Sequence, residues 1–335
     1  MKQKTIFVVI AGIIAIGLLA IFGYYLSKGS RPETNTDIST DLAGVRTPQI
    51  DEKLEFPATI TDSKGHQITL ESSPKKIIVT SSEAAHCLIF LGKSEYVIGR
   101  LSHQKQPELA HAKVVSSGSM EANFEAMAGM KPDLVLTNLM NYEDKVRSFE
   151  KYRLPYFAFK IEKINEMAKM YGLFARLLDA PPEKIEELKK LLAKLNEVEK
   201  RLEGLKPEER PKVFFEVGYR PSPRTLAGDS IAGDIIWKAG GRMFPVGKSF
   251  NAPVSIESLM NDPPDWYLIG QGFLAEKTTN EEIKQRPMLG KLPCIQNDKF
   301  LLVDSLSYIQ SHPRTIDNII ELAKKLHPDR MRDFE

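Results

Sequence analysis

The chain has 335 residues, of which 42% are hydrophobic and 27% are charged, and its formal net charge is +2. A chain of this length and apolar content can bury a large core, and it is too long for one ordinary domain. The near balance of charge offers no basic surface, so we expect no nucleic-acid partner. Cys87 and Cys294 are too few for a disulfide framework, and their apolar neighbours predict two separate buried thiols.

The amino terminus contains an apolar segment, Ile6 to Leu26, which has no charged residue and follows Lys2 and Lys4. Its length of about 20 residues suits a bilayer, whereas the core of a cleavable signal has about 7–15 residues. We therefore predict that residues 1–28 are a membrane anchor, with a removed signal segment as the open alternative. Lysines kept inside place the rest of the chain outside the cytoplasm. Residues 29–55 are polar and aperiodic, which predicts a flexible tether.

Residues 56–178 are predicted to form a first α/β lobe. Apolar and polar residues alternate on both sides of Ser63-Lys64-Gly65, which predicts a β-hairpin. A buried strand at 76–80 precedes a helix that Ser81 or Ser82 caps and Gly92 ends. Further strands are predicted at 97–99, 114–115, 134–137 and 156–159, and a further helix at 164–178.

Residues 179–209 are predicted to form one long helix between two lobes. Leucine, isoleucine and valine recur at spacings of three and four, and lysine and glutamate fill the positions between them. Pro181 and Pro182 suit the first turn of a helix, and Gly204 with Pro207 suits its end. A coiled-coil partner helix is the alternative, but the stripe covers only about three heptads.

Residues 210–335 are predicted to form a second α/β lobe. It begins with a strand at 212–217 and continues with a helix at 231–239, capped by Asp229 or Ser230. A helix near 280–285, a strand at 300–303 and a closing helix at 314–326 follow. Strands that alternate with helices predict two doubly wound lobes with mostly parallel sheets, joined by the long rigid helix.

The same pattern occurs once in each lobe, at 123–136 and 255–268. Glu125 and Glu257 are 132 residues apart, as are Pro132 and Pro264. Each copy contains a polar N-cap, a short amphipathic helix, a Pro-Asp turn and an apolar strand, which is an α/β unit.

These features resemble the substrate-binding proteins of ABC importers for vitamin B12, ferric siderophores and haem, the group with a single long helix between its lobes. The resemblance covers residues 56–328 and depends on the order of its parts. These include the hairpin at 61–70, the strand at 74–79, Gly118-Ser119 with the first repeat, Ala239-Gly240-Gly241, the second repeat and the stretch at 289–300. A lipid-attachment cysteine is missing.

The resemblance implies an extracytoplasmic, membrane-tethered protein that binds a metal chelate between its lobes. Its implied partners are an ABC permease and its ATPase, and we expect a monomer without a cofactor or catalytic residues. In that family one glutamate on each lobe docks on the permease, and the matching residues are Glu125 and Glu257. Each glutamate also lies two residues after a predicted N-cap, where a helix dipole alone favours a carboxylate.

Ligand contacts are expected at the carboxyl ends of the parallel strands, where such sheets bind ligands. Arginine and tyrosine there suit an anionic or aromatic chelate, although each could be a solvated or packing residue. The expected contact residues are Ser82, His86, Arg100, His103, Tyr142, Tyr219, Arg220, Arg224, Arg242, Phe244 and Tyr308. Further residues expected at this edge are Ser81, Glu83, Met140 and Phe273.

Two other functions compete with chelate binding. Capture of a free transition-metal ion needs converging ligands, and among six histidines only His86 and His103 are expected near the ligand. A chelatase-like enzyme is the more distant alternative, because the chain has no nucleophile elbow, Walker loop or His-Glu-x-x-His motif.

Overall fold

The computed structural model describes residues 54–334, except 119–120, 220–221, 246–250 and 273–276. The predicted anchor, all but the last two residues of the tether, Arg220 and Phe273 lie outside the described residues. Within the described part, no helix combines the length and the apolar character that crossing a bilayer requires.

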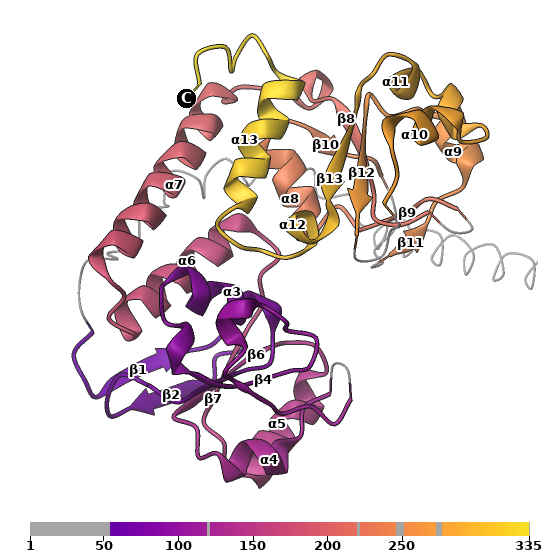
Figure 1. Ribbon diagram of the computed structural model, residues 1–335. Helices are drawn as coiled ribbons and strands as arrows, with labels where there is room; N and C mark the ends of the chain where they lie inside the picture. The colour runs from indigo at the N-terminus through magenta and orange to yellow at the C-terminus, as the bar shows by residue number, and fades with distance from the viewer. Residues whose placement is uncertain (1–53, 119–120, 220–221, 246–250, 273–276, 335) are drawn as a thin grey trace, which may run out of the picture. The chain divides into compact units, whose positions relative to one another are not determined.

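The first lobe contains a parallel sheet with spatial order β5-β4-β3-β6-β7. Its strands are β3 (Ile77–Val79), β4 (Val97–Arg100), β5 (Lys113–Val114), β6 (Leu134–Asn138) and β7 (Tyr156–Phe159). Its helices are α3 (Ser82–Phe90), α4 (Phe124–Gly129), α5 (Tyr142–Lys151) and α6 (Ile164–Leu177). Ile77 and Val79 share an apolar cluster with α3 and α6, whereas Ile78 shares one with α4 and α5. Helices therefore cover both faces of the sheet, as predicted (Figure 1).

The predicted hairpin consists of β1 (Ala58–Thr61) and β2 (Gln67–Leu70), paired antiparallel. Gly65 in its turn has a φ of 82°, a backbone conformation that favours glycine. The Asp62 carboxylate accepts hydrogen bonds from the backbone N–H groups of Lys64, His66 and Ala158. Because Ala158 belongs to β7, this one side chain both closes the turn and fixes the hairpin to the edge of the sheet.

The second lobe contains a parallel sheet with spatial order β10-β8-β12-β13. Its strands are β8 (Lys212–Glu216), β10 (Arg242–Met243), β12 (Trp266–Gln271) and β13 (Phe300–Asp304), and a separate antiparallel pair joins β9 (Arg224–Thr225) to β11 (Ala252–Pro253). Its helices are α8 (Ile231–Lys238), α9 (Ile256–Asn261), α10 (Asn280–Gln285), α11 (Pro293–Gln296), α12 (Ser305–Ile309) and α13 (Thr315–Leu326). Phe214 and Phe215 enter different apolar clusters, so this sheet is also covered on both faces.

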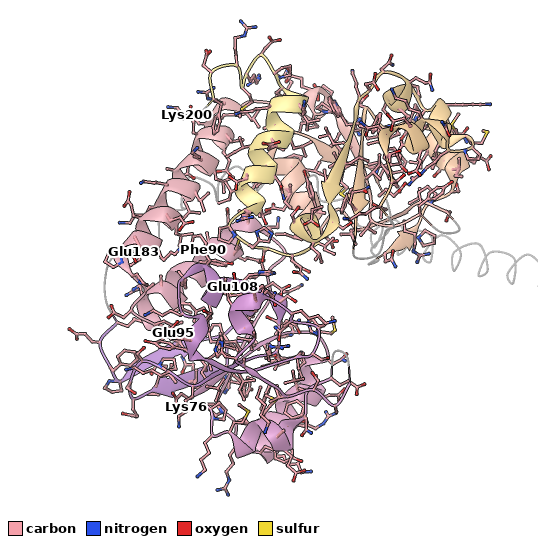
Figure 2. The ribbon with its side chains drawn as sticks, viewed as in Figure 1. Lys76, Phe90, Glu95, Glu108, Glu183 and Lys200 are labelled. Atoms are coloured by element: carbon pink, nitrogen blue, oxygen red, sulfur yellow. The ribbon has the colours of Figure 1, made fainter. Side chains whose placement is uncertain are left out.

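The long helix is α7 (Pro182–Arg201), and Figure 2 labels Glu183 and Lys200 near its two ends. Its 20 residues span about 30 Å, and it ends before the predicted limit, since Gly204 has left the helix with a φ of 77°. Near its start, Lys184 Nζ lies 5.6 Å from the centre of the Phe90 ring of α3. Near its end, Glu199 pairs with Lys238 of α8. The helix therefore contacts both lobes, while the lobe limits given above remain a prediction.

The repeated Pro-Asp pair has the same structural role in both lobes. Asp133 Oδ2 accepts hydrogen bonds from the backbone N–H groups of Lys75 and Lys76 at 2.9 and 2.8 Å, immediately before β3. Asp265 Oδ2 accepts one from Lys212, the first residue of β8, at 2.7 Å. The backbone N–H groups of Asp133 and Asp265 donate back to the carbonyls of Lys76 and Lys212. Each aspartate thus aligns the first strand of its lobe with the strand that follows the repeat.

We expect Asp133→Ala to lower the free energy of unfolding by about 1–2 kcal/mol, because two backbone N–H groups lose a charged acceptor. Asp265→Ala is expected to have a smaller effect, since one N–H group is affected. Urea denaturation followed by circular dichroism measures both. The control is Asp144→Ala, which removes an exposed ion pair with Arg147 within α5 and should change stability by less than about 0.5 kcal/mol. Equal effects at Asp133 and Asp144 would contradict the alignment role.

Candidate functional site

Each sheet has one place where the direction of strand addition reverses. In the first lobe the chain moves outward from β3 to β4 and β5, then returns to the other side of β3 with β6. In the second lobe it moves from β8 to β10, then returns to the other side of β8 with β12. Ligands of open α/β sheets bind at the carboxyl ends of the two strands that flank such a reversal. The candidate site therefore includes the ends of β3, β6, β8 and β12.

In the first lobe, a half-buried lysine lies at this reversal. Lys145 Nζ of α5 donates to Oδ1 of Asn138 at 2.8 Å and to its carbonyl oxygen at 3.3 Å, at the end of β6. Burial lowers the pKa of Lys145 to about 8, although the charge of Glu83, which follows β3, acts in the opposite direction. An amine held in this way can donate to an acceptor on a ligand.

The remaining first-lobe residues that the sequence indicated have differing surroundings. Ser81 caps α3 and Ser82 is its first residue, while His103 and Met140 are exposed. The Arg100 guanidinium donates to the carbonyl oxygens of Leu109 and Leu101 at 3.0 and 3.3 Å, which directs it into its own lobe. Tyr142, the first residue of α5, lies under Lys64 Nζ, and burial raises its pKa.

His86 is the first-lobe candidate that contacts the second lobe. Its Nε2 lies 3.1 Å from Oε1 of Gln310, a residue that follows α12. The ring centres of His86 and His312 are 5.4 Å apart. Burial, together with His86 and Arg314, lowers the pKa of His312 to about 4, so this ring is neutral at pH 7.

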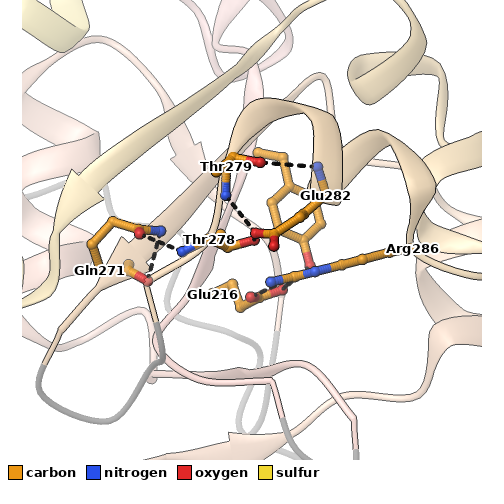
Figure 3. Close-up of polar contacts among 8 residues, drawn as sticks. Glu216, Gln271, Thr278, Thr279, Glu282 and Arg286 are labelled. Carbon is orange, nitrogen blue, oxygen red and sulfur yellow. Dashed lines mark hydrogen bonds and ion pairs between the residues drawn. The ribbon is translucent and has the colours of Figure 1, made fainter.

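In the second lobe, a buried ion pair lies at the reversal (Figure 3). Glu216, the last residue of β8, is completely buried and accepts hydrogen bonds from Tyr267 Oη at 2.7 Å and from Arg286 Nη1 at 2.7 and 2.9 Å. Burial raises the pKa of Glu216, although Arg286 and Tyr267 favour its charged form. The Arg286 guanidinium carbon lies 4.1 Å from the centre of the Tyr219 ring, which suits a cation–π contact.

Arg286 is held in place through α10. Thr279 and Glu282 form a capping box at the start of this helix, with N–H to oxygen distances of 2.8 and 3.2 Å (Figure 3). The Thr278 N–H donates to Oε1 of Gln271 at 2.9 Å, which joins the start of α10 to the end of β12. Arg286 follows α10 directly, so these bonds fix where its side chain enters the site.

The structure brings only some of the second-lobe candidates to this edge. Tyr219 lies at this edge, against Arg286. The Arg224 guanidinium is engaged by Asn251: its Nε donates to Oδ1 at 2.9 Å and its Nη2 donates to the carbonyl oxygen at 2.6 Å. In the register of the parallel strands β10 and β8, Arg242 lies beside Lys212 at the amino ends of both strands. These ends form the edge of the sheet opposite to the candidate site. Phe244 and Tyr308 are buried, packed against Phe214 and Phe215 respectively. Phe244 and Tyr308 thus take part in apolar packing and Arg242 lies at the far edge of the sheet, and ligand contact by these three residues stays a prediction.

Glu125 and Glu257 occupy equivalent places in the two lobes. Each is the second residue of its helix, after an N-cap side chain, Asn123 or Ser255, that accepts a backbone hydrogen bond at 3.0 Å. Both glutamates are exposed. Their geometry is compatible with docking and with a simple interaction with the helix dipole.

The described residues offer no metal site made of three carboxylate, thiol or imidazole ligands. Within the described parts of the chain, no three His, Cys, Asp or Glu side chains converge as a set of metal ligands. Cys87 and Cys294 are buried and unpaired with one another, as predicted. Burial raises the pKa of Cys294 to about 11, which keeps this thiol protonated at neutral pH.

Sequence reasoning missed five residues that carry most of the polar chemistry at these edges and between the lobes: Lys145, Glu216, Arg286, Gln310 and His312. One signal was available, because Glu216 interrupts the otherwise apolar stretch Val213-Phe214-Phe215-Glu216-Val217. A charged residue inside a buried strand needs a partner, and that requirement alone could have prompted a search for a cation.

Comparison with known proteins agrees with this architecture. A family model described as "Periplasmic binding protein" matches residues 77–306. The chain is 22% identical over 282 residues to the Bacillus subtilis protein named "Uncharacterized ABC transporter substrate-binding lipoprotein YvrC", covering 83% of this chain and 88% of that one. It is 22% identical over 307 residues to a "Cobalamin-binding protein" of Halobacterium salinarum, covering 86% and 81%. The structure of Helicobacter pylori CeuE with Ni-His has a TM-score of 0.64 at 20% identity, covering 83% and 91%.

We expect Arg286→Met to lower the free energy of unfolding by about 3–5 kcal/mol at pH 7, because Glu216 is left buried without its cation. The pKa of Glu216 is higher in the folded protein than in the unfolded chain. As pH rises from the unfolded-state pKa through the folded-state pKa, the unfolded chain loses its proton first, and the free energy of unfolding decreases. The deficit of the variant should therefore shrink at pH 5. Urea midpoints at pH 7 and pH 5 measure both effects.

Arg332→Met is the control for this experiment, because Arg332 forms an exposed pair with Asp329. Its effect should be below about 1 kcal/mol at both pH values. An Arg286→Met deficit that is small, or that grows at pH 5, would contradict the assignment of Glu216 as a buried carboxylate that depends on Arg286.

Proposed function

This chain belongs to the periplasmic binding protein family and is an extracytoplasmic substrate-binding protein of an ABC transporter, and from this premise we propose that it captures a metal chelate. The observation that carries the proposal is the pair of strand reversals, one in each lobe, with ionic groups at both edges. Lys145 supplies a donor in the first lobe, and Arg286 with Tyr219 supplies a cation and a ring in the second. Such groups suit a large ligand with acceptor atoms and flat or apolar parts.

The choice of ligand class is supported by the relatives. One relative is named for cobalamin, and one solved neighbour holds a nickel–histidine complex, so both carry a metal inside an organic ligand set. We propose a corrinoid, haem or a ferric siderophore for this chain. We also propose that it binds its ligand without transforming it, acts as a monomer and is tethered to the membrane through Ile6–Leu26.

The ligand proposal is tested by calorimetric titration of the protein starting at Lys53. The titrants are cyanocobalamin, haem and ferric enterobactin, compared with free Ni²⁺, Co²⁺, Zn²⁺ and Fe³⁺. We expect one chelate to bind at one per protein and more tightly than the free ion that it contains. Arg286→Lys should weaken this binding, since a lysine cannot reproduce the stacked, forked guanidinium. Binding of free ions alone, with no response to any chelate, would overturn the proposal.

We propose further that Glu125 and Glu257 contact the permease. Charge reversal to lysine at either position should slow uptake in cells and weaken association with the permease, because loss of a desolvated charge pair costs about 2–5 kcal/mol. Affinity for the ligand should stay unchanged, since both side chains are exposed at the starts of α4 and α9.

The matched control for docking is Glu183→Lys. Glu183 is also the second residue of a helix, α7, and is also exposed, but it lies outside the repeat. The three substitutions therefore disturb a helix dipole to a similar degree. Uptake that falls equally with Glu183→Lys, or that stays normal with both Glu125→Lys and Glu257→Lys, would show that the repeated glutamates only stabilise helix starts.

A further inference from the structure

We propose that His86, Gln310 and His312 form a binding site for one divalent transition-metal ion, such as Cu²⁺, Ni²⁺ or Zn²⁺, where the two lobes meet. His86 belongs to α3 of the first lobe, and Gln310 and His312 lie between α12 and α13 of the second. Imidazole nitrogens and an amide oxygen are donors that these ions accept. This site would bind a free ion, so the proposal is separate from the capture of a metal chelate.

The distances between the side chains suit a shared ion. Nε2 of His86 and Oε1 of Gln310 are 3.1 Å apart, and two donors bound to one tetrahedral ion at about 2.1 Å each lie roughly 3.4 Å apart. The ring centres of His86 and His312 are 5.4 Å apart with the planes inclined by 52°. Two imidazoles that each bind such an ion through one nitrogen have ring centres roughly 5 Å apart. Both separations are close to those expected of donors that share one ion.

The backbone N–H of His312 donates to Thr315 Oγ1 at 3.1 Å. Among the described residues, none forms a hydrogen bond with a ring nitrogen of His312, so the ring is available for ligation. Two other described histidines are engaged differently, since His66 stacks on Tyr156 and His327 Nε2 lies 3.0 Å from the carbonyl oxygen of Gly240. The contact between His86 and His312 therefore brings together two imidazoles from different lobes.

The proposed site has three uncharged protein donors, two imidazoles and one amide oxygen. They leave a tetrahedral ion with one coordination position for water or for a donor atom of a bound molecule. The third donor is an amide, which agrees with the absence of any cluster of three His, Cys, Asp or Glu among the described residues. An ion bound here would connect α3 to the segment before α13 and so stabilise the contact between the lobes.

The test uses the protein from Lys53 onward, without a polyhistidine tag and freed of metal with a chelator. Equilibrium dialysis with CuCl₂, NiCl₂ and ZnCl₂ at pH 7.5 should give one bound ion per protein for at least one of them. His86→Ala and His312→Ala should each weaken that binding by at least about tenfold. Gln310→Glu should strengthen it about tenfold, because a carboxylate adds charge to the same donor position. The control His111→Ala, at an exposed position, should leave binding unchanged.

Two results would overturn the site: no one-to-one binding of any of the three ions, or binding that survives in the His86→Ala/His312→Ala double variant. If either alanine variant fails to fold by circular dichroism, Gln310→Glu and the nitrogen hyperfine structure of bound Cu²⁺ still decide the question. Equal affinity in Gln310→Glu and the unaltered protein, or a Cu²⁺ spectrum without nitrogen ligands, would contradict the proposal. Chelate titration of the same samples keeps the two proposals separate, because either can fail while the other holds.

Discussion

One continuous apolar core holds both lobes against the helices between them, and the rest of the structure depends on it. Leu188, Leu192, Leu195 and Val198 of α7 are buried in a cluster that also contains strand residues of both sheets, α6, α8 and α13. The Ile164 N–H at the start of α6 also donates to Asp234 of α8 at 2.8 Å. Interiors packed in this way resist gradual deformation. The carboxyl edges of the two sheets are therefore presented by a packed core instead of by flexible connecting strands.

Each of the two strand reversals holds an ionic group that is at least half buried. Because of this burial, the protonation of each group depends strongly on its hydrogen-bond and ion-pair partners. Lys145 is held by Asn138 near Glu83, and Glu216 is held by Arg286 and Tyr267. A low local dielectric strengthens each of these interactions and makes an unpaired member costly. The same property makes these groups responsive to a charged ligand, because an added acceptor or donor changes the balance in a place where water screens little.

Much of the fold could be predicted from the sequence, because periodicity and capping are local signals. The hairpin, the helix α3 with its Ser81 cap, the strand β7 and the helix α10 lie where the residues indicated. The repeat was also visible, although its Pro-Asp pair proves to align strands and is more than a turn. The helix α5 was missed because Tyr142–Lys151 is mostly charged and only Phe149 in it is fully buried. Its absence from the prediction also concealed Lys145.

The site was harder to predict because availability of a side chain depends on residues far away in the sequence. Arg224 is typical of a ligand-binding loop, yet Asn251 engages its guanidinium. Conversely, His312 lies in a segment without helical or strand periodicity. It comes close to His86 only because the chain after α12 folds back onto α3. The contact between Gln310 and His86 in the same place joins residues that are 224 positions apart in the sequence. Residue type therefore identifies chemistry, whereas tertiary contacts decide which groups remain free to use it. For this protein the contact between the lobes, more than either lobe alone, determines which imidazoles can act together.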